Sequence, residues 1–160
     1  MNNESPITQK GFDKVQTELN QLIRVDREEI KVAISEAREL GDLKENAEYH
    51  SAKEKQSILE GRISQLQGII ATSRVVDISE IKSDKIVFGA TVNLLDVDKD
   101  QSITYQIVGD VESDINKGKI SFKSPLGKAL IGKEEGDTAI VKAPKGDVEY
   151  EVESFEFIVD

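Results

Sequence analysis

Apolar residues in the first half of the chain recur at steps of three and four positions, the spacing of one face of an α-helix. The first series is Phe12, Val15, Leu19, Leu22, Asp26, Ile30, Ala33, Ala37 and Leu40. The second series is Ala52, Gln56, Leu59, Ile63, Leu66, Ile70 and Ser73. No proline occurs between Gly11 and Lys123, so nothing in the sequence forces a break in either series. The pattern predicts two long helices.

The segment between the two series, Leu40-Gly-Asp-Leu-Lys-Glu-Asn46, carries the turn signals. Gly41 can adopt the left-handed conformation that ends a helix. Asp42 is expected to cap the second helix, with Glu45 three residues later closing a capping box. Thr8 is the expected N-cap of the first helix. The simplest arrangement is an antiparallel hairpin, about 50 Å long at 1.5 Å per residue.

One irregularity interrupts the first series. Two consecutive steps of four meet at Asp26, where we expect an eleven-residue element that locally relaxes the left-handed supercoil.

The period changes to two after about Val76, as expected for β-strands. The predicted strands are 90–97, 102–108, 119–122, 138–142 and 148–152. Ser124 and Pro125 supply an N-cap and a first-turn proline for a short helix that ends near Gly132. The pattern predicts an α+β protein with a helical hairpin domain over residues 1–76. A small, largely antiparallel sheet domain follows over residues 77–160.

The amino-acid composition excludes several kinds of site and of partner. The sequence has no cysteine, which excludes disulfides, thiolate metal sites and cysteine nucleophiles. Its net charge is −10, with 11 basic and 13 acidic residues through Val76 and 10 and 18 after it. Broad nucleic-acid binding needs clustered basic residues, so we expect a protein partner instead. No apolar run approaches the roughly 18 residues that span a membrane, and we expect a cytoplasmic protein.

The segment Ala37–His50, AREL-GDLKENAEYH, closely resembles the hairpin tip of the GreA/GreB family of bacterial transcript cleavage factors. The resemblance continues in the same order through Gly89–Val92, Tyr105–Asp110 and Ser124–Glu135. It implies a coiled-coil hairpin followed by a domain with an FKBP-like fold. In this family the second domain docks at the rim of the RNA polymerase secondary channel, and the hairpin passes down the channel.

The resemblance also implies a function and a site. Two tip acids of the family reach the polymerase active centre, and the matching residues here are Asp42 and Glu45. The protein would not itself be an enzyme. As a transcription elongation factor, it would stimulate the polymerase's own Mg²⁺-dependent cleavage of the 3′ end of backtracked RNA and so rescue arrested complexes. Asp42 would complete the shell of a Mg²⁺ shared with the polymerase, and Glu45 would orient or deprotonate the attacking water. This division of roles stays open, and no metal is expected in the isolated protein.

Further residues follow from the same resemblance. The expected tip and channel contacts are Leu40, Gly41, Leu43, Lys44 and Asn46. Arg38 and Lys53 match a basic patch near the extruded 3′ RNA segment, and Lys55 lies close to it in the sequence. Pro125, Leu126 and Ile131 are expected in the polymerase-docking surface. We expect a monomer when the protein is free.

Each assignment has a structural alternative. Asp42 and Glu45 would ordinarily be read as a helix cap, and the three basic residues as solvated charges. His50 and Tyr49 are expected to serve packing or the surface rather than a metal or RNA. At the level of function, the alternatives are a channel-occupying regulator that does not cleave, a prolyl isomerase or peptide binder, and a hairpin-based adaptor.

Overall fold

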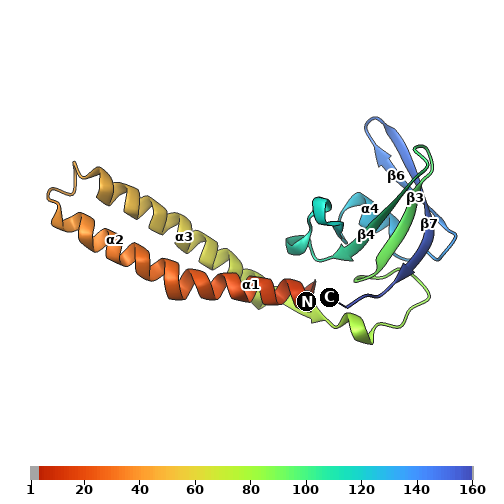
Figure 1. The fold of residues 1–160 in the computed structure, drawn as a ribbon, viewed down its shortest axis with the longest axis horizontal. Coiled ribbons are helices and arrows are strands. Elements are labelled where there is room, and N and C mark those ends of the chain that lie inside the picture. Colours follow the sequence, from red (N-terminus) through yellow and green to blue (C-terminus); the bar gives the residue numbers. More distant parts are fainter. Residues whose placement is uncertain (1–3, 160) are drawn as a thin grey trace. The chain divides into compact units, whose positions relative to one another are not determined.

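The computed structural model describes residues 4–159 and has the predicted α+β composition, a helical hairpin and a β-sheet (Figure 1). The chain forms two compact units. The helical unit is Phe12–Thr72, and the sheet unit comprises the chain up to Gly11 together with everything from Ser73 onward. The predicted boundary after Val76 therefore lies close to the end of the helical unit, but the N-terminal segment belongs with the sheet.

Two antiparallel arms form the helical unit (Figure 1). One arm is continuous through α1 (Gln9–Gln21), the π-helical segment η1 (Leu22–Asp26) and α2 (Arg27–Glu39). The other arm is α3 (Ala47–Thr72). The arms bury apolar side chains against each other, and the buried ones are Ile34, Ala37, Ala52, Leu59, Ile63 and Leu66. The second predicted series is thus confirmed at its first four apolar positions, Ala52, Leu59, Ile63 and Leu66.

The first series is displaced in its last part. Ala33 and Leu40 were expected in the seam, but both are exposed, and Ile34 is buried in place of Ala33. The π-helical segment lies upstream of this change, and its i to i+5 hydrogen bonds fit one extra residue into a turn. The later position Ala37 is buried as predicted, so the departure is confined to Ala33 and to Leu40 at the end of α2. The irregularity expected at Asp26 is a π-helical turn.

Two ion pairs link the arms on the outside of the seam. The Arg27 guanidinium donates to both carboxylate oxygens of Glu60 at 3.0 and 2.8 Å. Arg62 donates in the same way to Glu18 at 2.8 and 2.9 Å. These hydrogen bonds raise the pKa of each guanidinium above its already high ordinary value. Because all four side chains are largely solvated, the pairs fix the register of the arms more than they stabilise them.

A five-stranded sheet forms most of the sheet unit, in the order β5-β4-β3-β7-β6. Its strands are β3 (Thr91–Asp96), β4 (Gln101–Val108), β5 (Lys119–Ser121), β6 (Thr138–Ala143) and β7 (Gly146–Glu156). Only β4 and β5 pair in parallel, so the prediction of a largely antiparallel sheet is confirmed. The short helix α4 (Pro125–Leu130) starts at Ser124, whose hydroxyl accepts from the Gly127 amide, as predicted.

One face of the sheet packs on the main core. That core contains Ile86, Ala90, Val92, Leu94, Ile107, Ile120, Leu130, Ala139 and Val152. Inward residues alternate along β3, where Val92 and Leu94 are fully buried.

The sequence pattern did not predict a second, two-stranded sheet. β1 (Ser5–Thr8) and β2 (Ser73–Val76) pair in parallel, from Ser5 opposite Ser73 to Thr8 opposite Val76. These strands immediately precede α1 and follow α3. Among residues 4–159, no helix combines the length and apolar character needed to cross a membrane.

Candidate functional site at the hairpin tip

The first arm of the hairpin ends as its glycine predicted. Leu40 closes the last turn of α2, and its amide donates to the Ala37 carbonyl at 3.2 Å. Gly41 follows with a φ of +130°, a backbone angle that residues with a Cβ rarely adopt. The chain therefore leaves the helix abruptly, directly before Asp42.

The predicted cap of the second helix is wrong. Asn46, and not Asp42, caps α3, because its Oδ1 accepts from the amide of Tyr49, the third helical residue, at 3.0 Å. Asp42 instead accepts from the Lys44 amide at 3.0 Å in a local turn. Glu45 lies in this turn before the helix, so no capping box forms. Asn caps helices as well as Asp does, so its place directly before Ala47 is the signal that could have identified it.

Asn46 also ties the two arms together. Its amide nitrogen donates to the carbonyl of Ala37, in the last turn of α2, while its oxygen caps α3. The Ala37 carbonyl, which already accepts from the Leu40 amide, thus receives a second hydrogen bond from the other arm. One side chain therefore closes the loop between the arms.

A second closure involves Lys44 and His50. The Nε2 atom of His50, in the first turn of α3, lies 3.1 Å from the Lys44 carbonyl oxygen. The backbone of Lys44 is thus held at its amide by Asp42 and at its carbonyl by His50. The turn carrying the two acids is braced from both ends.

Both acids present free oxygens to solvent. Asp42 and Glu45 are exposed, and only the Oδ1 atom of Asp42 accepts a protein hydrogen bond. Within residues 4–159, no group of three or more His, Cys, Asp or Glu side chains could hold a metal ion. Two exposed carboxylates nevertheless fit Mg²⁺, which prefers oxygen ligands and commonly takes only one or two carboxylates from a protein. Any metal site here would need ligands from elsewhere.

The other predicted tip residues follow this loop. Leu40 is 67% exposed and Leu43 is 41% exposed, so the apex presents apolar surface beside its acids. Lys44 is exposed, whereas Asn46 is half-buried by its two hydrogen bonds. These positions suit contacts with a partner.

Only part of the predicted basic patch is brought together. Arg38 lies over the Tyr49 ring, 5.8 Å from its centroid, and Lys53 follows Tyr49 by one helical turn on the same face of α3. Lys55 is two positions further and points to a different side, about 200° around the helix. Sequence proximity alone had joined Lys55 to the patch.

The predicted docking residues lie in the sheet unit. Pro125 is exposed at the first position of α4, and Ile131 is 39% exposed at its end. Leu126 packs partly against the main core. Pro125 and Ile131 are therefore available to a partner, and Leu126 also serves the fold.

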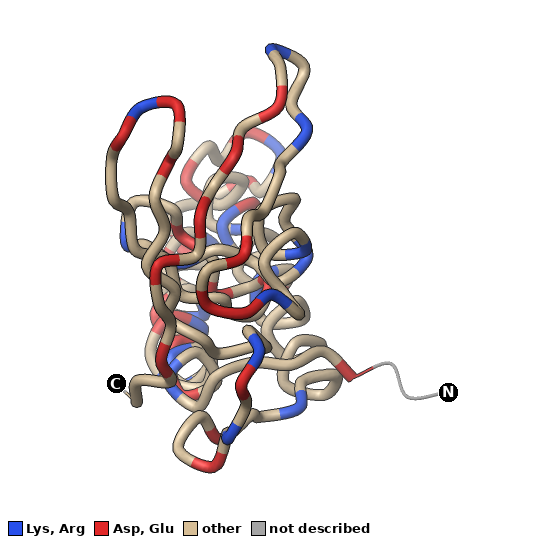
Figure 2. Tube along the Cα trace, turned by 90° about the vertical axis from the view of Figure 1, so that its right-hand side faces the viewer, with Lys and Arg blue, Asp and Glu red and all other residues tan. Residues whose placement is uncertain are grey.

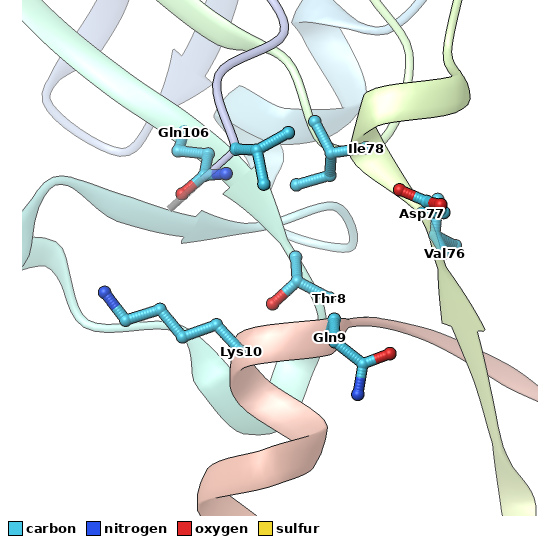
Figure 3. A pocket seen from close by; sticks show the side chains of 8 residues that line it. Thr8, Gln9, Lys10, Val76, Asp77, Ile78 and Gln106 are labelled. Carbon is cyan, nitrogen blue, oxygen red and sulfur yellow. The ribbon is translucent and has the colours of Figure 1, made fainter.

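Two other features of the sheet unit, the acidic strand β7 and a small pocket, do not suit a phosphate or a small-molecule ligand. The acids of β7, marked red in Figure 2, are Asp147, Glu149, Glu151, Glu153 and Glu156, and they make that strand unsuitable for phosphates. A pocket of about 50 Å³ near Thr8, Ile78 and Gln106 (Figure 3) is far smaller than the roughly 300 Å³ at which ligand sites begin.

Comparison with known proteins finds one protein family matching both parts of the chain. Residues 5–75 match the family described as "Transcription elongation factor, N-terminal", and residues 81–157 match "Transcription elongation factor, GreA/GreB, C-term". The chain is 52% identical over 155 residues to transcription elongation factor GreA of Xylella fastidiosa strain 9a5c, covering 96% of this chain and 98% of that protein. It is 49% identical over 157 residues to GreA of Rickettsia conorii, covering 98% and 97%.

A solved structure is also similar along the chain. The crystal structure of GreA factor homolog 1 (Gfh1) of Thermus thermophilus is 26% identical, with a TM-score of 0.44, and the match covers 96% of this chain and 99% of that one. The two family matches together span residues 5–75 and 81–157, and the GreA relatives are similar over nearly their whole length. The chain therefore belongs to the GreA/GreB family of transcription elongation factors.

Proposed function

We propose that this protein binds bacterial RNA polymerase in the cytoplasm and inserts its hairpin into the secondary channel. There it stimulates the polymerase's own cleavage of the 3′ end of backtracked RNA. Cleavage creates a new 3′ end in register with the active centre and so restarts an arrested complex. Family membership supports a role in elongation, and the tip supports this particular mechanism.

The observation that carries the proposal is the pair of exposed carboxylates in a braced turn. Between Asp42 and Glu45 lies Lys44, whose amide and carbonyl are both held by hydrogen bonds. Acids that only capped a helix would point their oxygens at its amides, but here Asn46 performs that task. The acids are therefore available to a partner.

Mg²⁺ bound in the polymerase would activate water and stabilise the leaving oxygen during hydrolysis. Asp42 would offer its free oxygen to this ion, directly or through a water. Glu45, which has no role in the fold of the turn, would orient or deprotonate the attacking water. Arg38 and Lys53 would contact phosphates of the displaced 3′ segment. Pro125, Leu126 and Ile131 would contribute to docking at the channel rim.

Cleavage by reconstituted backtracked complexes tests the proposal. RNA length would be followed with the wild type, Asp42→Asn, Glu45→Gln and the double variant. Glu48→Gln is the matched control, because Glu48 is an exposed acid in the first turn of α3, close to the same loop. We expect each tip variant to slow cleavage at least about 100-fold, as for a lost group in a preorganised site, and the control to keep wild-type rates.

Two results would separate the mechanism from its rivals. Excess Mg²⁺ should partly restore cleavage by Asp42→Asn if that acid recruits the metal. A factor that only occupies the channel would lower transcript yield without releasing 3′ fragments. Full cleavage by the double variant would rule out the proposed role of the acids.

A further inference from the structure

His50 lies in the first turn of α3, and its ring contacts the loop that carries the two tip acids. Its Nε2 atom lies 3.1 Å from the carbonyl oxygen of Lys44. A carbonyl oxygen can only accept a hydrogen bond, so Nε2 must carry the proton and donate it. The contact therefore defines the ring's orientation and its hydrogen-bonding role.

The group that His50 holds is well placed to control Glu45. The carbonyl of Lys44 and the amide of Glu45 belong to one planar peptide. Fixing that carbonyl fixes the plane from which the Glu45 Cα and side chain emerge. The Lys44 amide meanwhile donates to Asp42 Oδ1 at 3.0 Å, so the same residue couples the two acids.

The position of His50 is itself fixed by the helix and by a neighbouring ring. It lies in the first turn of α3, and its amide donates to the Asn46 carbonyl at 3.1 Å. Its ring meets the Tyr49 ring edge-on, with centroids 5.7 Å apart and planes at 67°. A ring held by a helix can restrain a loop that has few other contacts.

We propose that His50 is a positioning residue for Glu45 and Asp42, acting through the backbone of Lys44 and touching neither metal nor RNA. This inference rests on the proposed function of the two acids. Its physical content is preorganisation: groups that must meet a reacting centre act efficiently only when their geometry is set beforehand. Without the His50 hydrogen bond, the turn would sample orientations in which Glu45 points elsewhere.

Two substitutions separate the hydrogen bond from the ring. His50→Phe keeps a flat ring and removes the donor, and His50→Gln removes the ring and keeps a donor of similar reach. Cleavage would be measured over a range of factor concentrations on backtracked complexes. We expect His50→Phe to lower the maximal rate about 10-fold while the half-saturating concentration changes less than about 2-fold, because loss of positioning acts on the reaction rather than on docking. His50→Gln should recover most of the rate.

A second readout does not depend on cleavage. Backbone ¹⁵N relaxation of the free protein should show faster local motion of the Lys44 and Glu45 amides in His50→Phe than in the wild type or His50→Gln. Helical content and unfolding midpoint should be the same in all three. Unchanged relaxation together with a wild-type maximal rate for His50→Phe would overturn the inference, as would a His50→Gln variant that is as impaired as His50→Phe.

Failure of this inference is distinguishable from failure of the proposed function. If Asp42→Asn and Glu45→Gln abolish cleavage while His50→Phe does not affect it, the acids act without the hydrogen bond from His50 to Lys44. If the double acid variant cleaves normally, the proposed function itself is wrong, whatever His50 does.

Discussion

The carboxylate of Glu112 accepts a hydrogen bond from the backbone amide of Thr8, 104 positions earlier in the chain, at 2.8 Å. It also accepts from the Thr8 hydroxyl and, at 2.9 Å, from the Gly109 amide. Thr8 in turn accepts from the Gly11 amide at 3.1 Å, which confirms it as the N-cap of α1. One carboxylate thus fixes the residue at which the first helix starts.

Glu112→Ala should lower the free energy of unfolding of the sheet unit by about 2 kcal/mol. The variant leaves partly buried donors of Thr8 and Gly109 without their charged acceptor. Urea unfolding in a Tyr49→Phe background, followed by the fluorescence of the remaining Tyr105 and Tyr150, would measure the change. Asp110→Ala, an exposed acid in the same turn, is the control and should change stability by less than about 0.5 kcal/mol.

The effect of Gly11→Ala on the free energy of unfolding should change sign between the wild type and the Glu112→Ala variant. A Cβ at Gly11 would lie 2.2 Å from Glu112 Oε1, so in the wild type it would displace the carboxylate and destabilise the protein. In the Glu112→Ala background that conflict is gone, and alanine should stabilise the helix by about 0.5–1 kcal/mol relative to glycine. Equal effects of Gly11→Ala in both backgrounds, measured by the same unfolding experiment, would refute this account of the glycine.

Asn46 should matter to the helical unit through two separable bonds. Asn46→Ala loses both the cap of α3 and the bond to Ala37, and should cost about 1–2 kcal/mol. Asn46→Asp keeps a capping oxygen but cannot donate to Ala37, so it should cost less. Thermal unfolding followed by circular dichroism would rank the two. A loss in Asn46→Asp as large as in Asn46→Ala would show that the cap contributes little.

Side chains of one helix should differ sharply in their contribution to the hairpin seam. Leu66 is 1% exposed between the arms, and Leu66→Ala should cost about 2–5 kcal/mol through lost burial and a cavity. Ile58 lies on the same helix and is 68% exposed, so Ile58→Ala should change stability by less than about 0.5 kcal/mol. Urea unfolding of both variants provides the comparison.

Alkaline pH should weaken the sheet unit through Tyr150. Burial of its ring, the negative charge of Asp96 and the nearby Tyr105 raise the pKa of Tyr150 above its ordinary value near 10. Between these two values the unfolded chain has lost the proton that the folded chain keeps, so the free energy of unfolding falls as pH rises. Tyr150→Phe should show a smaller fall between about pH 9 and 11. An equal fall in both proteins would mean that Tyr150 ionises freely in the fold.

The sequence was informative where a pattern extended over many residues. The steps of Ala52 to Leu66 gave the buried face of α3, and the alternation around Val92 and Leu94 gave the inward face of β3. The Ser124–Pro125 pair gave the start of α4, because its capping chemistry is local.

The sequence pattern could not predict features that depend on contacts between distant parts of the chain. β1 and β2 are four residues each, too short to show a period, and their pairing depends on the hairpin between them. The seam contains Ile34 instead of Ala33, and because both are apolar the pattern could not choose between them. At the tip, Asp42 and Asn46 are equally good caps, and the bond from Asn46 to Ala37 favours Asn46 only once both arms are folded.

The parallel pair β1–β2 makes the helical unit an insertion rather than a preceding domain. Ser5–Thr8 leaves the ribosome before the hairpin, and its partner Ser73–Val76 is made only after the whole hairpin. Joining them directly would close a long loop at an entropic cost. A hairpin that folds first brings both ends of that loop together. The order of synthesis therefore favours folding of the helical hairpin before β1 and β2 pair.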